Sequence, residues 1–188
     1  MSNLNPLIER NHMFAESGSH KQLTPMPKHP VVVLACMDQR VDPAHILGID
    51  LGDALVLRNV GGRVTEAVIA DVTFVALLAE TMLGDKAPTF EVAIIHHTEC
   101  GTRFLSDDDF RHSFANRIGA DEAHLATQAV IDPAVSVVTD VEALLASTLG
   151  SERVSVSGHV YDVTTGRVTT VMGPVASAGR ESVAADHH

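Results

Sequence analysis

The sequence predicts an α/β fold with a mostly parallel central sheet, flanking helices and an antiparallel hairpin at one edge. Apolar runs rich in β-branched residues, at 31–35 and 90–95, are typical of strands that are buried on both faces of a parallel sheet. Segments with helical spacing lie between the strand-like runs, and this alternation is typical of an α/β sheet. Residues 164–166 (Thr-Thr-Gly) separate two further strand-like segments and predict the edge hairpin.

The N-terminal residues predict a helix followed by an extended arm. The helix is expected over residues 5–14, because Asn5 can cap it and Pro6 suits the first helical position. The polar stretch 16–28 contains two prolines and is expected to be extended. Because such an arm rarely stands alone in water, we expect it to wrap around its own core or around a partner subunit.

The central elements are expected to alternate along the chain. They are a buried strand, a short helix, a second strand, a long helix ended by Gly84 and a further buried strand, at residues 31–35, 43–47, 54–57, 64–82 and 90–95. Further helices are expected after Ser106, which we take as a cap before three aspartates, and at residues 122–130 and 140–149. The last strands are expected at residues 154–156, 159–163 and 168–171.

Length and composition are those of one globular domain. The 188 residues, 45% of them hydrophobic, are expected to form a single domain over residues 1–188, in which residues 1–29 are the helix and arm. The terminal pair His187 and His188 resembles the remnant of an expression tag and is left aside.

Charge and hydropathy argue against several classes of partner and location. The 13 basic and 24 acidic side chains give a formal net charge of −11, whereas nucleic acid requires a cationic face. No uninterrupted apolar run reaches the ~18 residues of a membrane span, so no membrane partner is expected. The first six residues lack the basic-then-apolar order of a secretory signal, so we expect a cytoplasmic location.

Both cysteines of the sequence lie in clusters of ionisable residues that follow predicted buried strands. Cys36 follows the strand at 31–35, and His97 and Cys100 follow the strand at 90–95. Ligand sites in open α/β sheets lie beyond the carboxyl ends of strands, so the two clusters converge if these strands are neighbours. Two thiolates and one imidazole are ligands that zinc favours, with one position left for water, although copper and iron also accept them.

Two ionisable residues close to Cys36 strengthen the zinc hypothesis. Asp38 and Arg40 are two positions apart, so their side chains point to the same side if the chain is extended there. They could form an ordinary surface ion pair. Next to two thiolates, however, Arg40 can neutralise Asp38 in a bidentate pair. Asp38 then either orients a metal-bound water or occupies the fourth metal position itself.

Three other patterns have simpler explanations than a separate site. Gly61 and Gly62 follow a strand, but neither a dinucleotide fingerprint nor a Walker lysine accompanies them, which disfavours nucleotide binding. The three aspartates at 107–109 suit a helix N-terminus better than a hard-cation site. Because no Cys-x-x-Cys motif is present, a redox pair of Cys36 and Cys100 is disfavoured.

Three segments resemble the signature segments of the β-class carbonic anhydrases. They are residues 36–40 (Cys-Met-Asp-Gln-Arg), 58–62 (Arg-Asn-Val-Gly-Gly) and 96–101 (His-His-Thr-Glu-Cys-Gly). Their order and spacing match the family over residues 30–102, and residues 158–166 resemble the family's last hairpin. The compact length and the third segment are most similar to a small bacterial branch of the family.

The resemblance implies a metal site and a catalytic pair. It implies one zinc ion per chain, held by Cys36, His97 and Cys100. It also implies that Asp38 and Arg40 are the catalytic residues, with Asp38 acting as a zinc ligand only in a closed state of the site.

The resemblance also bears on the substrate pocket. It implies that Gly61 and Gly62 belong to the pocket wall, where glycine permits close backbone approach. His96 is expected to pack or to support the site, because along a strand it points away from the neighbouring ligand. Gln39 and Val60 replace a small residue and an alanine that are common in the family, which leaves the pocket volume and the substrate preference open.

The implied function is that of a carbonate dehydratase, a lyase that hydrates carbon dioxide reversibly to bicarbonate and a proton through zinc-bound hydroxide. One alternative is a hydrolase of carbonyl sulfide or carbon disulfide on the same scaffold, because that reaction also attacks the carbon of a linear triatomic molecule. A second alternative is a non-catalytic zinc-stabilised module closed by four ligands. The resemblance also implies a homodimer or a multiple of dimers, with active sites at the subunit interface.

Overall fold

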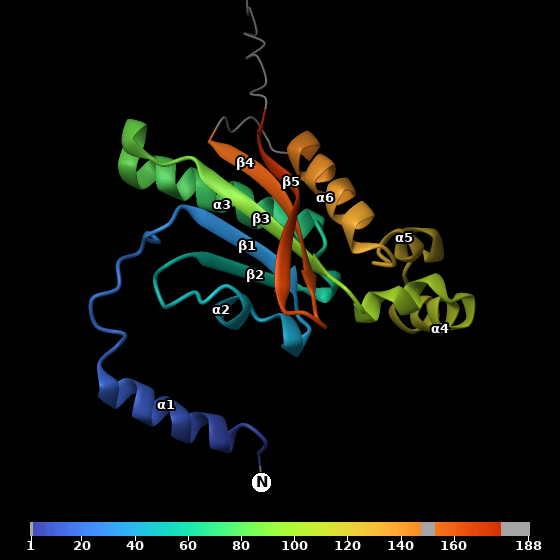
Figure 1. Ribbon diagram of the computed structural model, residues 1–188, viewed down its shortest axis with the longest axis horizontal. Coiled ribbons are helices and arrows are strands. Elements are labelled where there is room, and N and C mark those ends of the chain that lie inside the picture. The colour runs from blue at the N-terminus through green and yellow to red at the C-terminus, as the bar shows by residue number, and fades with distance from the viewer. Residues whose placement is uncertain (1, 148–152, 178–188) are drawn as a thin grey trace, which may run out of the picture.

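A five-stranded sheet forms the centre of the protein. The computed structural model describes residues 2–147 and 153–177, and Figure 1 shows the sheet with helices around it. The strand order is β2-β1-β3-β4-β5, in which the strands β1 to β5 are Val31–Cys36, Leu55–Asn59, Phe90–His97, Val154–Asp162 and Arg167–Ala176. All neighbouring strands are parallel except β4 and β5, which are antiparallel. The predicted fold class is therefore confirmed.

The helices cover the sheet unequally. In the described part of the chain, the α-helices α1 to α6 are Asn5–Ser17, Pro43–Ile46, Glu66–Leu83, Asp108–Ile118, Glu122–Thr127 and Pro133–Ser147. Helices α3 and α6 pack on one face of the sheet, and Ile46 at the end of α2 and Ile49 after it pack on the other face. Helices α4 and α5 lie beyond the end of β3 (Figure 1).

The main core lies between the sheet and the helices α3 and α6. Leu34 of β1, Ile94 of β3 and Leu144 of α6 are completely buried there, together with Val68 and Val72 of α3. Burying one such side chain stabilises the fold by about 1.5–3 kcal/mol. This packing holds β1 and β3 side by side at the centre of the sheet.

A smaller core on the opposite face reaches the ends of these two strands. It contains Val33, Ile95 and Tyr161, and it also contains both cysteines, Cys36 and Cys100. The predicted metal ligands are therefore part of the packed interior.

Two predicted helix caps are wrong. Leu4, not Asn5, precedes α1, and its side chain makes no cap hydrogen bond. Asp107, not Ser106, caps α4 by accepting a hydrogen bond of 2.8 Å from the Phe110 amide. The reason is that residues 101–106 form a 3-10 helix, in which the Ser106 hydroxyl donates to the Arg103 carbonyl at 2.7 Å.

Several predicted boundaries also shift. Strand β4 is continuous, whereas separate strands at 154–156 and 159–163 were predicted. Gly158 lies within it because α6 passes close by, and a Cβ atom there would lie 3.1 Å from Val141 Cγ2. Helix α6 begins seven residues before the predicted position, and α5 ends at Thr127. The predicted end of the helix at 140–149 lies outside the described residues.

Helix α3 carries apolar residues on more than one side. Val72 and Ala76 pack on the sheet, whereas Phe74 and Leu77 are exposed. No membrane span is expected from the sequence because charged residues interrupt the apolar run, but by length and composition alone the segment Glu66–Lys86 could cross a membrane. One side of the helix packs on the sheet as part of the domain core, and the other side exposes apolar side chains.

Helix α1 stands apart from the sheet at the end of an extended arm (Figure 1). None of its residues is buried. The predicted helix is confirmed but runs three residues further, to Ser17, and the predicted arm follows it without helix or strand up to β1. Leu4 before the helix is exposed, and so are four apolar residues of the helix, Leu7, Ile8, Met13 and Phe14.

Candidate metal centre

The carboxyl ends of β1 and β3 bring the predicted ligands together. The strands are parallel neighbours with Ala35 opposite Ile95, so Cys36 and His97 end them at the same edge of the sheet. A short turn after β3 returns Cys100 to this edge. The ligand atoms of these three buried residues lie within 4.8 Å of one another, and the two sulfur atoms are 4.0 Å apart. The predicted convergence of the two clusters is confirmed.

The imidazole of His97 is oriented as a metal ligand. Its Nδ1 atom lies 2.9 Å from the Thr98 carbonyl oxygen, which can only accept, so Nδ1 carries the proton and Nε2 does not. Among the described residues, this Nε2 is the one buried side-chain nitrogen or oxygen atom without a hydrogen-bond partner. A buried polar atom without a partner is costly, and a metal ion at Nε2 would satisfy it. The site therefore fits zinc.

The two thiols share one proton more readily than they release two. The hydrogen bond between their side chains lowers the pKa of Cys100 to about 6, and the Thr102 hydroxyl also lowers it. The same bond between the thiols, together with burial, raises the pKa of Cys36 to about 12. A second negative charge 4.0 Å from the first is unfavourable unless a cation lies between them. A divalent metal ion supplies that positive charge.

Asp38 and Arg40 form the predicted bidentate pair. The Asp38 carboxylate accepts hydrogen bonds from Arg40 Nη2 at 2.8 Å, from Nε at 3.1 Å and from the Arg40 amide at 2.9 Å. These bonds lower the pKa of Asp38 to about 2, so the carboxylate is ionised at neutral pH. The chain is not extended here: Asp38 caps a 3-10 turn over Gln39–Val41, and this turn brings the two side chains together.

Two further residues, Glu99 and Arg58, hold this pair and were not among the predicted site residues. Arg40 Nη1 also donates to Glu99 Oε2 at 3.1 Å, and Glu99 has the left-handed φ of 57° that is uncommon for a residue with a side chain. Arg58 donates to the carbonyl oxygens of Cys36 at 3.1 Å and Asp38 at 2.7 Å. Arg58 and Glu99 stand in the second and third signature segments, so their positions were a signal, but what their side chains contact depends on the folded chain.

The Gly61–Gly62 turn packs between the ends of β1 and β3. Both glycines have positive φ, 85° and 66°. A Cβ atom on Gly62 would lie 2.9 Å from the Cys36 amide nitrogen and 3.2 Å from the Ile95 carbonyl oxygen. Close backbone approach therefore requires glycine at this position, directly beside a metal ligand.

His96 points to the opposite side of β3 from His97, as expected. Its Nδ1 lies 2.8 Å from Ser136 Oγ and its Nε2 lies 3.1 Å from Asp140 Oδ2, both on α6. Arg63 donates two hydrogen bonds of 2.8 Å to the Asp140 carboxylate. This buried network connects α6 with the end of β3 and with the glycine turn.

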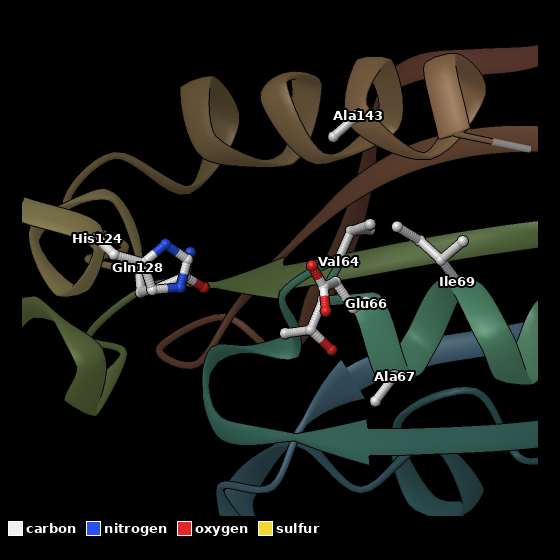
Figure 2. A pocket seen from close by; sticks show the side chains of 8 residues that line it. Val64, Glu66, Ala67, Ile69, His124, Gln128 and Ala143 are labelled. Atoms are coloured by element: carbon white, nitrogen blue, oxygen red, sulfur yellow. The ribbon is translucent and has the colours of Figure 1, made fainter. Parts of the chain in front are cut away.

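A cavity of about 520 Å³ lies between the start of α3 and the helices α5 and α6 (Figure 2). None of the three ligands lines it; the lining residues come from the start of α3 and the two residues before it, from α5 and the residue after it, and from α6: Val64, Thr65, Glu66, Ala67, Ile69, His124, Gln128 and Ala143. The labelled side chains gather no cluster of metal ligands, so the chemistry belongs at the strand ends.

Comparison with known proteins identifies the family. The family model described as carbonic anhydrase matches residues 31–110. Beta-carbonic anhydrase 1 of Mycobacterium tuberculosis is 30% identical over 161 residues, which cover 86% of this chain and 93% of that protein. The crystal structure of carbonic anhydrase from Streptococcus mutans superimposes with a TM-score of 0.71 at 33% identity, covering 91% of this chain and 98% of that one.

A second group of relatives is similar over a shorter region. Carbon disulfide hydrolase of Acidithiobacillus thiooxidans is 42% identical over 78 residues, which cover 40% of this chain and 35% of that protein.

The sheet, the Cys-His-Cys cluster and these similarities define a zinc lyase of the α/β class. The chain belongs to the β-carbonic anhydrase family. The predicted family is confirmed, and the family and the ligand cluster both support zinc-dependent hydration of carbon dioxide.

Replacing His97 by alanine is expected to remove stoichiometric zinc, because the remaining thiols cannot complete the ligand set. Metal analysis of protein purified without chelators should give one zinc ion per chain in the wild type and much less in the variant. His45→Ala is the control, since that side chain is 87% exposed and lies outside the cluster. Equal zinc content in the wild type and the His97 variant would contradict the assignment.

Proposed function

We propose that Asp38 and Arg40 are the catalytic pair with which this chain hydrates carbon dioxide. The observation that carries the proposal is the position of Asp38 beside a metal ligand: its amide donates to Cys36 Sγ at 3.4 Å, while Arg40 holds its carboxylate. An ionised carboxylate beside a metal ligand can accept a hydrogen bond from a reacting group, in addition to its contacts within the fold.

The reaction divides between the metal and these two residues. Zinc, when bound, supplies a Lewis acid that lowers the pKa of water and so makes a nucleophile near neutral pH. Asp38, ionised and able only to accept, holds the proton of that nucleophile and aims its lone pair at the carbon of CO2. Arg40 keeps Asp38 ionised and fixed, because its fork occupies both carboxylate oxygens.

The Arg40 contacts also argue against a permanently closed structural site. For Asp38 to become a fourth zinc ligand, its carboxylate would have to leave the hydrogen bonds that Arg40 donates from Nε, Nη2 and the amide. A carboxylate that is always bound to a metal ion is neutralised by that ion and needs no arginine to offset its charge. The bonds support an active site in which Asp38 is a zinc ligand only in a closed state.

Asp38→Asn is expected to reduce hydration by about 100-fold or more while one zinc ion per chain remains bound, because the amide cannot accept the proton and bind Arg40 as a carboxylate does. Stopped-flow CO2 hydration and metal analysis on the same preparation test this. Asp53→Asn is a control in which another carboxylate with an ion-pair partner, Lys28, is changed. Near-normal turnover in Asp38→Asn would overturn the assigned role.

Carbon dioxide is the substrate that the similarities favour. The β-carbonic anhydrase relatives match over nearly their whole length, whereas carbon disulfide hydrolases match over 34–42% of theirs. We expect hydration of CO2 to exceed hydrolysis of carbonyl sulfide and carbon disulfide in parallel assays with one enzyme preparation. Faster sulfide release than bicarbonate formation would support the alternative function.

The exposed apolar surfaces support a homodimer as the minimum assembly. A 13-residue helix is only marginally stable in water when it packs on nothing, and none of the residues of α1 is buried against the rest of the chain. Its Leu7 and Phe14, seven positions apart, lie on one side of the helix. Phe74 on the outer side of α3 is 63% exposed. A second copy that receives α1 would cover apolar area on both chains, and the extended arm provides the reach.

The double variant Leu7→Glu/Phe14→Glu is expected to shift the protein toward monomer in sedimentation experiments, since both substitutions charge the exposed side of α1. His12→Glu adds a carboxylate to the same helix away from that side and should leave the assembly unchanged. A wild-type chain that sediments as a stable, active monomer would refute the dimer.

A further inference from the structure

Each sulfur atom of the metal centre has a backbone hydrogen-bond donor, and Cys100 Sγ also lies next to the side-chain hydroxyl group of Thr102. Cys36 Sγ accepts the Asp38 amide at 3.4 Å, a backbone donor that no substitution removes except proline. Cys100 Sγ lies 3.2 Å from the hydroxyl oxygen of Thr102, which is a side-chain donor. The hydrogen bond from the Thr102 side chain to Cys100 can therefore be removed by a conservative substitution, whereas the backbone hydrogen bond to Cys36 cannot.

The direction of the Thr102 hydrogen bond follows from what its two partners, the Val130 amide and a thiolate, can donate and accept. Thr102 Oγ1 accepts the Val130 amide at 3.2 Å, and a hydroxyl group has one proton to donate. A sulfur that ligates a metal is a thiolate and can only accept. The hydroxyl proton of Thr102 must then point at Cys100 Sγ.

The surroundings keep this hydroxyl in place. Thr102 is 6% exposed and lies in the 3-10 helix that begins directly after Cys100. The Gly61 backbone packs against it, since a Cβ atom on Gly61 would lie 3.1 Å from Thr102 Cγ2. The Val130 amide belongs to the segment between α5 and α6, so Thr102 connects the metal ligand with the helical layer.

We propose that Thr102 is a positioning residue for the zinc ligand Cys100, whose thiolate it holds and partly neutralises through its hydroxyl group. This inference rests on the zinc site but not on the roles proposed for Asp38 and Arg40. Two thiolates donate more charge to zinc than imidazoles do and weaken it as a Lewis acid. A hydrogen bond to one thiolate withdraws part of that charge and so makes zinc a stronger Lewis acid.

Two substitutions separate the hydroxyl group from the shape of the side chain. Thr102→Val keeps the branched shape and removes the hydroxyl, whereas Thr102→Ser keeps the hydroxyl and removes the methyl group. Thr139→Val makes the same change on α6, where the hydroxyl donates to the Val135 carbonyl at 3.2 Å and does not contact the metal centre. Thr102→Ala is a second variant without hydroxyl, in case valine disturbs folding next to the sulfur.

The experiment compares the sulfur-to-cobalt charge-transfer band of the cobalt-substituted proteins. Without the hydrogen bond, the thiolate gives up an electron more easily, so the band should move to longer wavelength in Thr102→Val and Thr102→Ala. It should stay at the wild-type position in Thr102→Ser and Thr139→Val. Zinc release to a chromogenic chelator should be about 10- to 100-fold faster in Thr102→Val than in the wild type, the usual range for loss of a residue that supports a metal ligand.

Three results would overturn the proposal, and they separate the role of Thr102 from the existence of the metal site. An unchanged band in both variants without hydroxyl, or an equal shift in Thr102→Ser, would refute the role of Thr102 and leave the zinc site intact. Failure of the wild type to bind zinc or cobalt would refute the metal site and this inference with it.

Discussion

The parallel pairing of β1 with β3 is the interaction on which the rest of the structure depends. It places Ala35 opposite Ile95, so that both strands end side by side at one edge of the sheet. Because side chains alternate along a strand, a shift by one residue would turn Cys36 to the opposite face. Burial of Leu34 and Ile94 beneath α3 and α6 resists such a shift. The core thus fixes the positions of Cys36 and His97, and the turn after β3 then adds Cys100 to the ligand set.

The second constraint is the accumulation of negative charge at this edge. Two thiols and a carboxylate lie close together, and the thiolates and the carboxylate are neutralised by different groups. A divalent metal ion offsets the thiolates, Arg40 offsets Asp38, and hydrogen bonds from the Asp38 amide and the Thr102 hydroxyl spread the charge that remains on the sulfur atoms. In the proposed mechanism, this arrangement leaves the Asp38 carboxylate ionised for proton transfer, while the sulfur atoms bind the metal ion.

Much of this arrangement was predictable from the sequence because it depends on residue types at strand ends. Buried strands are readable from apolar runs, and parallel strands must end at one edge, so Cys36, His97 and Cys100 could be found. Thr102 and Glu99 could not, since their roles depend on where a 3-10 helix and a left-handed residue direct side chains toward groups distant in sequence. The cap of α4 was misplaced for the same reason, because Ser106 and Asp107 are both good caps and only the preceding turn decides between them.

The most direct test of the central claim is X-ray absorption at the zinc edge of the purified enzyme near neutral pH. We expect one zinc ion per chain with two sulfur neighbours and at least one imidazole nitrogen, because the ligand atoms of two thiols and one imidazole lie within 4.8 Å of one another. A zinc environment made only of nitrogen and oxygen atoms would contradict it, as would a preparation active in CO2 hydration that contains no metal.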